Sequence, residues 1–177
     1  TGKTSKRKQD FFVYVSDIIK NLDGINKEDI ILDIGGSTGY LTFCLSPLVK
    51  EIYSFDFSNK MINKSNKLNQ NNNNTYIYQD NIVFMKKTLA KKKVFSKIII
   101  GSVLQYLENY NQIESVFKNL SKVSSKKTKI LFTHNPEINK KKLFLKSYIK
   151  LNWPKKKILK SLDIEEKRLW LNFKKIK

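Results

Sequence analysis

Hydrophobic residues along this chain occur in two alternating patterns, which predict strands and helices in turn. Short apolar runs typical of strands buried on both faces occupy residues 30–34, 51–56, 75–79, 96–100 and 129–133. Apolar residues at helical spacing precede and separate these runs, for example Phe11, Val15, Ile18 and Leu22, or Ile113, Val116, Phe117 and Leu120. This alternation predicts an α/β protein with a three-layer α/β/α arrangement and a doubly wound, mainly parallel sheet.

Two predicted helices carry residues that set one of their ends. Pro47 removes an internal hydrogen bond from the helix after the first strand, so we expect that helix to end early or to kink. Ser58 is a favourable N-cap for the helix after the second strand. The face of that helix is predicted to carry Met61, Ser65 and Leu68.

The turn after the first strand is rich in glycine and leads directly into a helix. Gly35, Gly36 and Gly39 allow a sharp turn or a close approach to a ligand, and the helix start favours an anionic group. The dinucleotide spacing G-x-G-x-x-G is not met, because a serine and a tyrosine stand at the second and third glycine positions. The residues fit D-x-G-x-x-x-G, beginning at Asp33. Such a turn is either a nucleotide-type cofactor site or a plain strand-to-helix connection.

Acidic residues also follow the next two predicted strands. Asp56 ends the second strand about 20 residues after Gly35, near the spacing at which a carboxylate binds ribose hydroxyls in Rossmann-like sheets. Asp80 follows the third strand. Because ligands bind at the carboxyl ends of parallel strands, one cleft is expected to collect Asp33, Asp56, Asp80, Ser102 and His134.

Residues 10 to 135 resemble class I S-adenosylmethionine-dependent methyltransferases in four ordered segments. The first motif of that family is commonly D-x-G-x-G-x-G, and residues 96–107 are similar to its fourth-strand motif. Two residues depart from the pattern, since Ser37 replaces the middle glycine and Lys97 stands where an aspartate is common. The resemblance implies the class I fold and S-adenosylmethionine as methyl donor, with no metal.

The resemblance also implies which residues contact the cofactor. They lie at the ends of the first four strands, namely Asp33, Gly35, Gly36, Gly39, Asp56, Phe57, Asp80, Asn81, Ile82, Gly101 and Ser102. Asp33 would order the amino group of the methionine part, directly or through water, and Asp56 would accept from the ribose hydroxyls. Phe57 would lie beside the adenine, whose amino group would donate to Asp80.

The candidate general base is His134, the only histidine, which follows the fifth strand. Histidine titrates near neutral pH and can take a proton from a hydroxyl or an amine, although a lone loop histidine can also be a packing or surface residue. Gln105, Tyr106 and Tyr40 are the other polar residues expected near the cleft. No N-P-P-Y-like tetrapeptide follows the fourth strand, which argues against acceptors with amide or base nitrogens.

The formal net charge is +20 at pH 7, because 35 Lys and Arg residues outnumber 15 Asp and Glu residues. Such a charge attracts nucleic acid, anionic membranes or phosphorylated substrates. Only Arg7 and Arg168 are arginines, however, whereas proteins that read base edges usually depend on arginine. Nucleic acid is therefore an alternative partner that the composition does not favour, and it would bind the lysine runs at 3–8, 91–93, 140–142 and 155–157.

Composition and length favour one folded domain. The chain has 177 residues, of which 40% are hydrophobic, and its single cysteine, Cys44, cannot form an internal disulfide. No apolar run reaches about 18 residues, so no membrane span and a cytoplasmic location are expected.

Against the class I pattern, we divide the chain into three parts. Residues 1–9 form a basic N-terminal tail, residues 10–139 the cofactor-binding core, and residues 140–177 a C-terminal helical or substrate region. The closing strands of the class I fold are not evident in this last part, so it is either truncated or specialised for substrate. Residues 169–173 fit a late strand or a helix packed on the sheet edge.

The sequence thus favours a small class I methyltransferase that acts on an oxygen or nitrogen of a small-molecule, sugar or lipid acceptor. One alternative is an RNA methyltransferase, which the charge favours. Another is a non-catalytic binding or scaffold domain, suggested by Ser37, Lys97 and the missing closing strands. The acceptor and the oligomeric state are left open.

Overall fold

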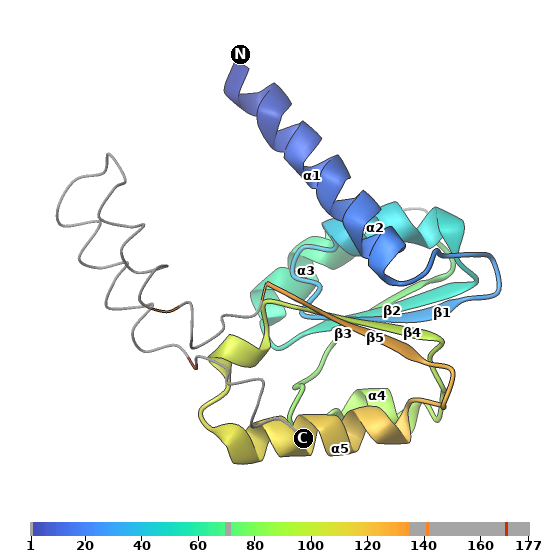
Figure 1. Cartoon of the computed structure of the whole chain (residues 1–177), viewed down its shortest axis with the longest axis vertical. Helices are drawn as coiled ribbons and strands as arrows, with labels where there is room; N and C mark the ends of the chain where they lie inside the picture. Colours follow the sequence, from blue (N-terminus) through green and yellow to red (C-terminus); the bar gives the residue numbers. More distant parts are fainter. Residues whose placement is uncertain (1, 70–71, 135–140, 142–168, 170–177) are drawn as a thin grey trace, which may run out of the picture.

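A computed structural model of the chain describes residues 2–69, 72–134, 141 and 169, with side chains from residue 11 onward. Within this part of the chain, five parallel strands form one sheet in the order β3-β2-β1-β4-β5 (Figure 1). The strands are β1 (Ile30–Ile34), β2 (Glu51–Asp56), β3 (Thr75–Gln79), β4 (Lys97–Gly101) and β5 (Lys129–Thr133). The predicted parallel α/β sheet is therefore confirmed.

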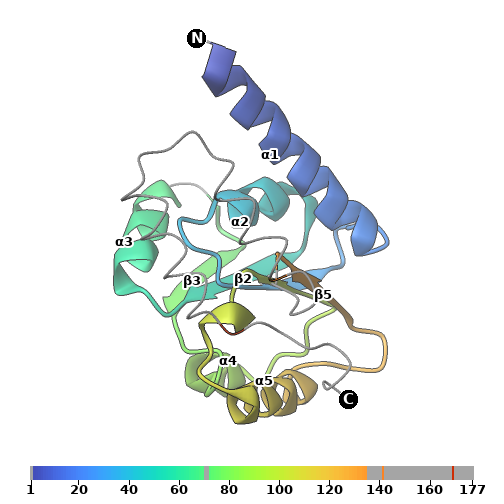
Figure 2. The same cartoon turned by 60° about the vertical axis from the view of Figure 1, so that its left-hand side comes forward.

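Helices cover both faces of this sheet (Figures 1 and 2). On one face lie α1 (Gly2–Asn21), α2 (Tyr40–Leu45) and α3 (Asn59–Leu68), and on the other lie α4 (Lys86–Ala90) and α5 (Tyr110–Lys122). Two short 3-10 helices, η1 (Ser46–Leu48) and η2 (Leu104–Tyr106), follow α2 and β4. The result is the predicted three-layer, doubly wound arrangement.

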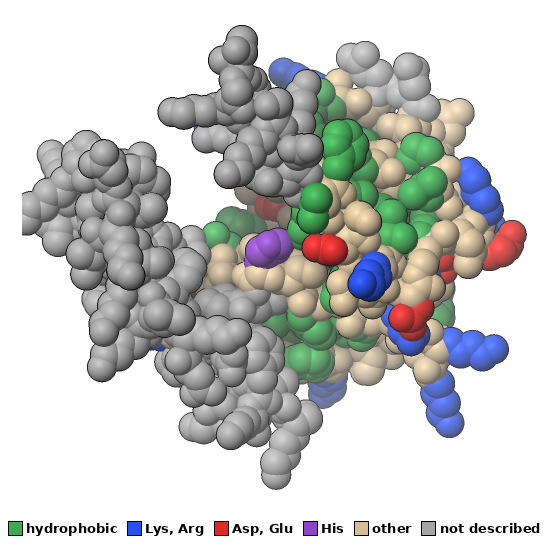
Figure 3. Space-filling model, turned by 45° about the horizontal axis from the view of Figure 1, so that its top comes forward, with side chains coloured by type: hydrophobic (Ala, Val, Ile, Leu, Met, Phe, Trp, Pro, Cys, Tyr) green, Lys and Arg blue, Asp and Glu red, His purple; other side chains and the backbone are tan. Residues whose placement is uncertain are grey.

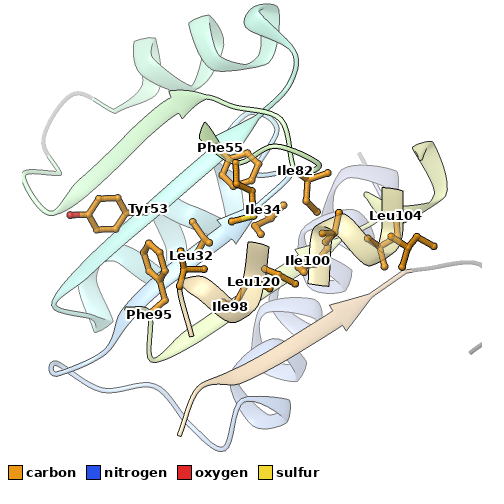
Figure 4. Close-up of a cluster of buried hydrophobic side chains, with 14 of the residues drawn as sticks. Leu32, Ile34, Tyr53, Phe55, Ile82, Phe95, Ile98, Ile100, Leu104 and Leu120 are labelled. Carbon is orange, nitrogen blue, oxygen red and sulfur yellow. The ribbon is translucent and has the colours of Figure 1, made fainter. Parts of the chain in front are cut away.

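The strands are apolar on both faces because each face packs against helices. Leu32 and Ile34 of β1 belong to a cluster with Ile98 and Ile100 of β4 and with Leu120 of α5 (Figure 4). The intervening residues Ile31, Ile52 and Ile99 pack with Ile18, Leu22 and Leu45 from α1 and α2. The side-chain alternation of a strand thus divides the core between the two helical layers.

The order of the strands reverses beside β1, and this reversal determines where the sheet can bind a ligand. β2 and β3 lie on one side of β1, and β4 and β5 lie on the other. In doubly wound sheets this reversal opens a crevice at the carboxyl ends of the central strands. The ends of β1, β2 and β4, at Ile34, Asp56 and Gly101, are therefore the positions from which a site is built.

The ends and faces of the helices agree with the sequence-based expectations only in part. As expected from Pro47, the helix of α2 stops at Leu45 and continues as η1. The segment predicted as a tail lies within α1, which begins at Gly2. In α3, Ser65 is buried as predicted, but Leu68 is exposed, because the buried face is set by Ile62 and Ser65, three residues apart.

Lys97 lies at the amino end of β4, at the opposite edge of the sheet from the glycine-rich turn. Its ammonium group pairs with Asp29 (Nζ to Oδ2, 3.4 Å) and donates to the backbone oxygens of Leu22 and Gly24. Asp29 also accepts from Ser96 Oγ at 2.8 Å. This departure from the motif therefore belongs to an internal ion pair between the amino end of β4 and the loop before β1.

The C-terminal part predicted at 140–177 lies outside the described residues, apart from two positions. At one of them, the backbone N–H of Leu169 donates to the carbonyl of Gln105 at 3.1 Å, and Leu169 packs against the core cluster under α5. The described helices include none that is long and apolar enough to cross a bilayer.

Candidate cofactor site

The glycine-rich turn is held tightly against β2 by backbone hydrogen bonds. Gly35 and Gly36 both donate their N–H groups to the carbonyl of Phe55, at 2.9 and 3.1 Å. Gly35 has φ of +80°, where glycine is favoured, and a Cβ built there would overlap the side chain of Val103. A Cβ on Gly36 would overlap Ser54 Oγ. These positions need glycine because the turn packs directly on its neighbours.

Ser37, the departure from the family motif, has a backbone conformation that glycine adopts readily. Its φ is +52°, in the left-handed region that side chains disfavour, and its side chain is exposed. The Ser37 N–H donates to Asp56 Oδ2 at 3.2 Å. The turn therefore follows the glycine path and is tied to the end of β2.

Asp56 is held in place at the end of β2 by two backbone donors. Besides the bond from Ser37, Oδ1 accepts from the N–H of Ser58 at 2.8 Å, and the side chain is only 9% exposed. Each carboxylate oxygen has more than one acceptor site, so both can still accept from a ligand hydroxyl. A fixed, ionisable acceptor thus stands beside the glycine-rich turn.

Asp80 has a structural role at the end of β3. Its Oδ1 accepts from the N–H of Asn81 at 2.9 Å, and its Oδ2 accepts from both the N–H and the hydroxyl of Thr88, each at 2.8 Å. Thr88 lies in α4, so Asp80 fixes the loop between β3 and that helix. The same loop then presents Asn81 and Ile82 toward the crevice.

A cavity of about 800 Å³ opens at this edge of the sheet. It brings together eight of the residues predicted from sequence, namely Gly35, Asp56, Phe57, Asp80, Asn81, Ile82, Gly101 and Ser102. Cavities that hold small molecules or cofactors typically measure about 300–1,000 Å³ and combine apolar walls with a few polar groups. The cavity therefore has the size and lining of a cofactor site.

Sequence reasoning missed part of the lining. Val103 and Tyr106 line the cavity as expected, but these residues at the strand ends and in the segments that follow were not singled out, namely Ile34, Ser37, Phe55, Ser58, Met61, Val83, Phe84, Leu107, Glu108 and Gln112. Val83 and Phe84 both lie in the loop after β3, and the Phe84 side chain is 60% exposed. Their position just after a strand was the available signal, since loops after parallel strands carry ligand contacts.

Four predicted residues do not line the cavity, and Asp33 is the most informative of them. It is buried beneath the glycine-rich turn, where its Oδ2 accepts from Thr42 Oγ1 at 2.6 Å. Burial raises the pKa of the Asp33 carboxyl to about 6; the nearby charge of Asp56 also raises it, and the bond from Thr42 opposes both. Gly36 and Gly39 lie within the turn and do not line the cavity either.

His134, the fourth, lies just after β5 on the α1 side of the sheet edge. It is exposed, and the histidine is visible on the face shown in Figure 3. Its ring centroid is 5.2 Å from that of Tyr14 in α1, a residue not singled out from sequence. Ser102 Oγ lies 3.5 Å from the His134 carbonyl oxygen, so His134 is next to the cavity wall without lining it.

The described residues contain no group of three or more histidine, cysteine or acidic side chains placed to hold a metal ion. The polar groups that face the cavity are instead carboxylates, hydroxyls and backbone groups, which suit the hydroxyls and amines of an organic cofactor.

Comparison with known proteins gives a family and a fold. A family model described as "Methyltransferase domain" matches residues 25–167. No match was found among curated proteins. Among solved structures, the chain is similar to the N-methyltransferase NodS from Bradyrhizobium japonicum in complex with S-adenosyl-L-homocysteine. The TM-score is 0.58 at 19% identity, covering 67% of this chain and 59% of that one.

Two other solved structures share the fold. YcgJ from Bacillus subtilis has a TM-score of 0.60 at 17% identity, covering 76% of this chain and 57% of its own. An rRNA methylase from Streptococcus thermophilus has a TM-score of 0.51 at 16% identity, covering 75% of each chain. The present chain thus spans less than two thirds of NodS and of YcgJ. From its sequence match and its sheet order, the chain belongs to the methyltransferase domain family and has the class I S-adenosylmethionine-dependent methyltransferase fold.

Proposed function

We propose that the chain transfers a methyl group from S-adenosylmethionine to an oxygen or nitrogen of a small-molecule acceptor. The observation that carries this proposal is the cavity between the glycine-rich turn and the loops after β2, β3 and β4, with the carboxylates of Asp56 and Asp80 on its wall. An organic cofactor with an adenosyl group carries hydroxyl and amine donors that match these acceptors.

Each part of the cofactor has a matching part of the cavity. Asp56 is positioned to accept from ribose hydroxyls, because both its oxygens are held by backbone N–H groups. Phe57, in the loop after β2, and Ile82, in the loop after β3, offer apolar surface for the adenine. Gly101 and Ser102 lie at the end of β4, where the sulfonium would be held.

Asp33 supports the binding of the methionine part from below the turn. Its carboxylate is buried, and no lysine or arginine in the described residues forms an ion pair with it. The cationic amino group of the cofactor would supply that missing positive charge, directly or through water. Cofactor binding would in turn favour the ionised form of Asp33.

The bound cofactor supplies a methyl group that is already activated on a sulfonium. The protein then has to hold the acceptor in line, exclude water and accept a proton. His134 is the proposed proton acceptor, since its backbone lies beside Ser102 at the cavity wall and imidazole can act as a general base. The activities named for the similar structures are an N-methyltransferase and an rRNA methylase, so the fold alone does not select the acceptor.

Calorimetric titration tests this proposal. We expect S-adenosylhomocysteine and S-adenosylmethionine to bind in a 1:1 ratio and to raise the melting temperature in a concentration-dependent way. AMP, which lacks the methionine part, is the matched control and should bind more weakly. If neither cofactor form gives heat or a thermal shift, the proposal fails and the non-catalytic scaffold alternative is favoured.

A further inference from the structure

We propose that the acceptor is a small amine, and that it binds in its cationic form against a wall of four aromatic rings formed by Phe11, Tyr14, Tyr40 and His134. This inference rests on the proposed function, because it assigns the acceptor to the other side of the same sheet edge. The four rings are called the aromatic wall below.

The aromatic wall is a continuous chain of ring contacts. The Phe11 ring in α1 lies 6.4 Å from the Tyr40 ring at the start of α2 and 6.4 Å from the Tyr14 ring, one turn further along α1. The Tyr14 ring is in turn 5.2 Å from the His134 ring after β5. Segments distant in sequence are thus brought together over the carboxyl ends of β4 and β5.

Gly101 and Ser102 lie between the aromatic wall and the cofactor cavity. Both residues line the cavity. On the other side, the Tyr14 hydroxyl is 3.6 Å from where a Cβ of Gly101 would stand, and 3.5 Å from Thr133 Oγ1. Because Gly101 has no side chain, the Tyr14 hydroxyl and Thr133 Oγ1 pack closely on the end of β4, so the aromatic wall adjoins the cavity lining at Gly101 and Ser102.

The ring geometry favours a compact cation over a flat aromatic acceptor. Interplanar angles of 71°, 43° and 50° along the aromatic wall leave no pair of parallel faces between which a flat ring could be sandwiched. Tilted rings instead can present more than one electron-rich face to a small group, and such faces attract ammonium ions.

Methyl transfer to such an acceptor balances with the groups present. The bound ammonium first passes a proton to the His134 imidazole, which leaves a lone pair on the acceptor nitrogen. That lone pair forms the new N–C bond as the S–CH₃ bond breaks. The bonding electrons stay on sulfur, so S-adenosylhomocysteine and a methylated amine are the products. Tyr14 takes no proton and serves as an acceptor-positioning residue.

The single histidine makes the binding step directly observable. With the protein saturated by S-adenosylhomocysteine, the imidazole C–H resonances of His134 are followed by NMR while tetramethylammonium chloride is added at constant ionic strength. We expect a saturable shift. Tert-butanol, a neutral molecule of the same shape, is the matched control and should give a much smaller shift.

Variants assign the effect to the aromatic wall. Tyr14→Ala should weaken tetramethylammonium binding by about 5- to 30-fold, whereas Tyr14→Phe, which keeps the ring, should change it by less than about 3-fold. Tyr76→Ala, which removes an exposed ring on β3, should have no effect. A linear, non-saturable shift, an equal response to tert-butanol, or unchanged binding in Tyr14→Ala overturns the inference.

The same samples separate this inference from the proposed function. If calorimetry shows that S-adenosylhomocysteine binds but tetramethylammonium leaves His134 unchanged, the aromatic wall is not an ammonium site and the cofactor assignment stands. If S-adenosylhomocysteine itself does not bind, the proposed function fails first.

Discussion

The two ends of the sheet both bury charged side chains, but they surround these charges in opposite ways. At the amino end, Lys97 is paired with Asp29 and also donates to two backbone oxygens, while Asp29 accepts from Asn26 N–H and from Ser96. At the carboxyl end, Asp33 is equally buried, yet it accepts from the neutral hydroxyl of Thr42, and the like charge of Asp56 acts on it.

This difference separates structural charge from functional charge. A buried ion pair with complete hydrogen bonding needs no ligand, so Lys97 and Asp29 are explained by the fold alone. A buried carboxylate without a cation destabilises the folded state, and such a group is found where a ligand completes the site. The contrast supports the proposal that the amino end serves stability and that the carboxyl end binds the cofactor.

The largest effect is expected from breaking the pair at the amino end. Lys97→Met leaves the Asp29 carboxylate buried without its cation, so the free energy of unfolding should fall by about 3–5 kcal/mol, measured by urea denaturation. The affinity for S-adenosylhomocysteine, measured on the folded fraction, should be unchanged. A loss below about 1 kcal/mol would mean that the charge at this end is not structural.

Asp33→Asn should act in the opposite direction. The pKa of Asp33 is about 6 in the folded state, above its value in the unfolded chain. Below about pH 4 the carboxyl is neutral in both states, so its burial does not lower the free energy of unfolding. As the pH rises through 6, the buried carboxyl must ionise and the free energy of unfolding falls. The amide stays neutral and can still accept from Thr42. At pH 7 the variant should therefore be more stable than the wild type, by on the order of 3 kcal/mol, and the difference should vanish near pH 4.

The same substitution should weaken cofactor binding, which sharpens the comparison. If the ionised Asp33 orders the cofactor's amino group, wild-type affinity should decline below about pH 6, and Asp33→Asn should be weak at every pH. Calorimetry between pH 5 and pH 7.5 measures both. A variant that gains stability and keeps full affinity would show that the buried charge has no role in binding.

A smaller effect on binding alone is expected for Asp56→Ala. Removing the proposed ribose acceptor should reduce cofactor affinity by about 1–3 kcal/mol. Glu114→Ala, which removes an exposed carboxylate on α5 away from the cavity, is the matched control. An unchanged dissociation constant in folded Asp56→Ala would exclude this residue from the site.

The smallest effect should come from Ser37→Gly, which restores the family's glycine. Relief of the left-handed conformation and the greater freedom of glycine when unfolded nearly cancel, so stability should change by less than about 1 kcal/mol. Cofactor affinity should also stay within about threefold, because the backbone path is already that of glycine. A large gain in affinity would show that Ser37 distorts the turn.

The strand pattern was sufficient to predict the parallel sheet, because buried parallel strands are apolar throughout and acidic residues mark their ends. The same logic placed Asp56 and Asp80 on one cavity. It did not reveal that Asp33 lies under the turn, since the direction of a strand-end side chain depends on which face of the sheet it occupies. For that reason Asp33 accepts a hydrogen bond from Thr42 and does not line the cavity.

Residues joined only by tertiary packing could not be found from sequence. Tyr14 and His134 are 120 positions apart, and nothing local indicates that their rings are in contact. Likewise, Lys97 was counted as a departure from the site motif, although it lies at the opposite edge of the sheet and pairs with Asp29. Its significance depends on the position of Asp29, which no local pattern gives.

The central claim is that the cavity between the glycine-rich turn and Asp80 holds the adenosyl group of the methyl donor. A crystal structure of the protein with S-adenosylhomocysteine tests it most directly. The account predicts the ribose hydroxyls within hydrogen-bonding distance of Asp56 and the adenine between the loops that carry Phe57 and Ile82. A ligand bound elsewhere, or a cavity closed by side chains when the ligand is present, would contradict it.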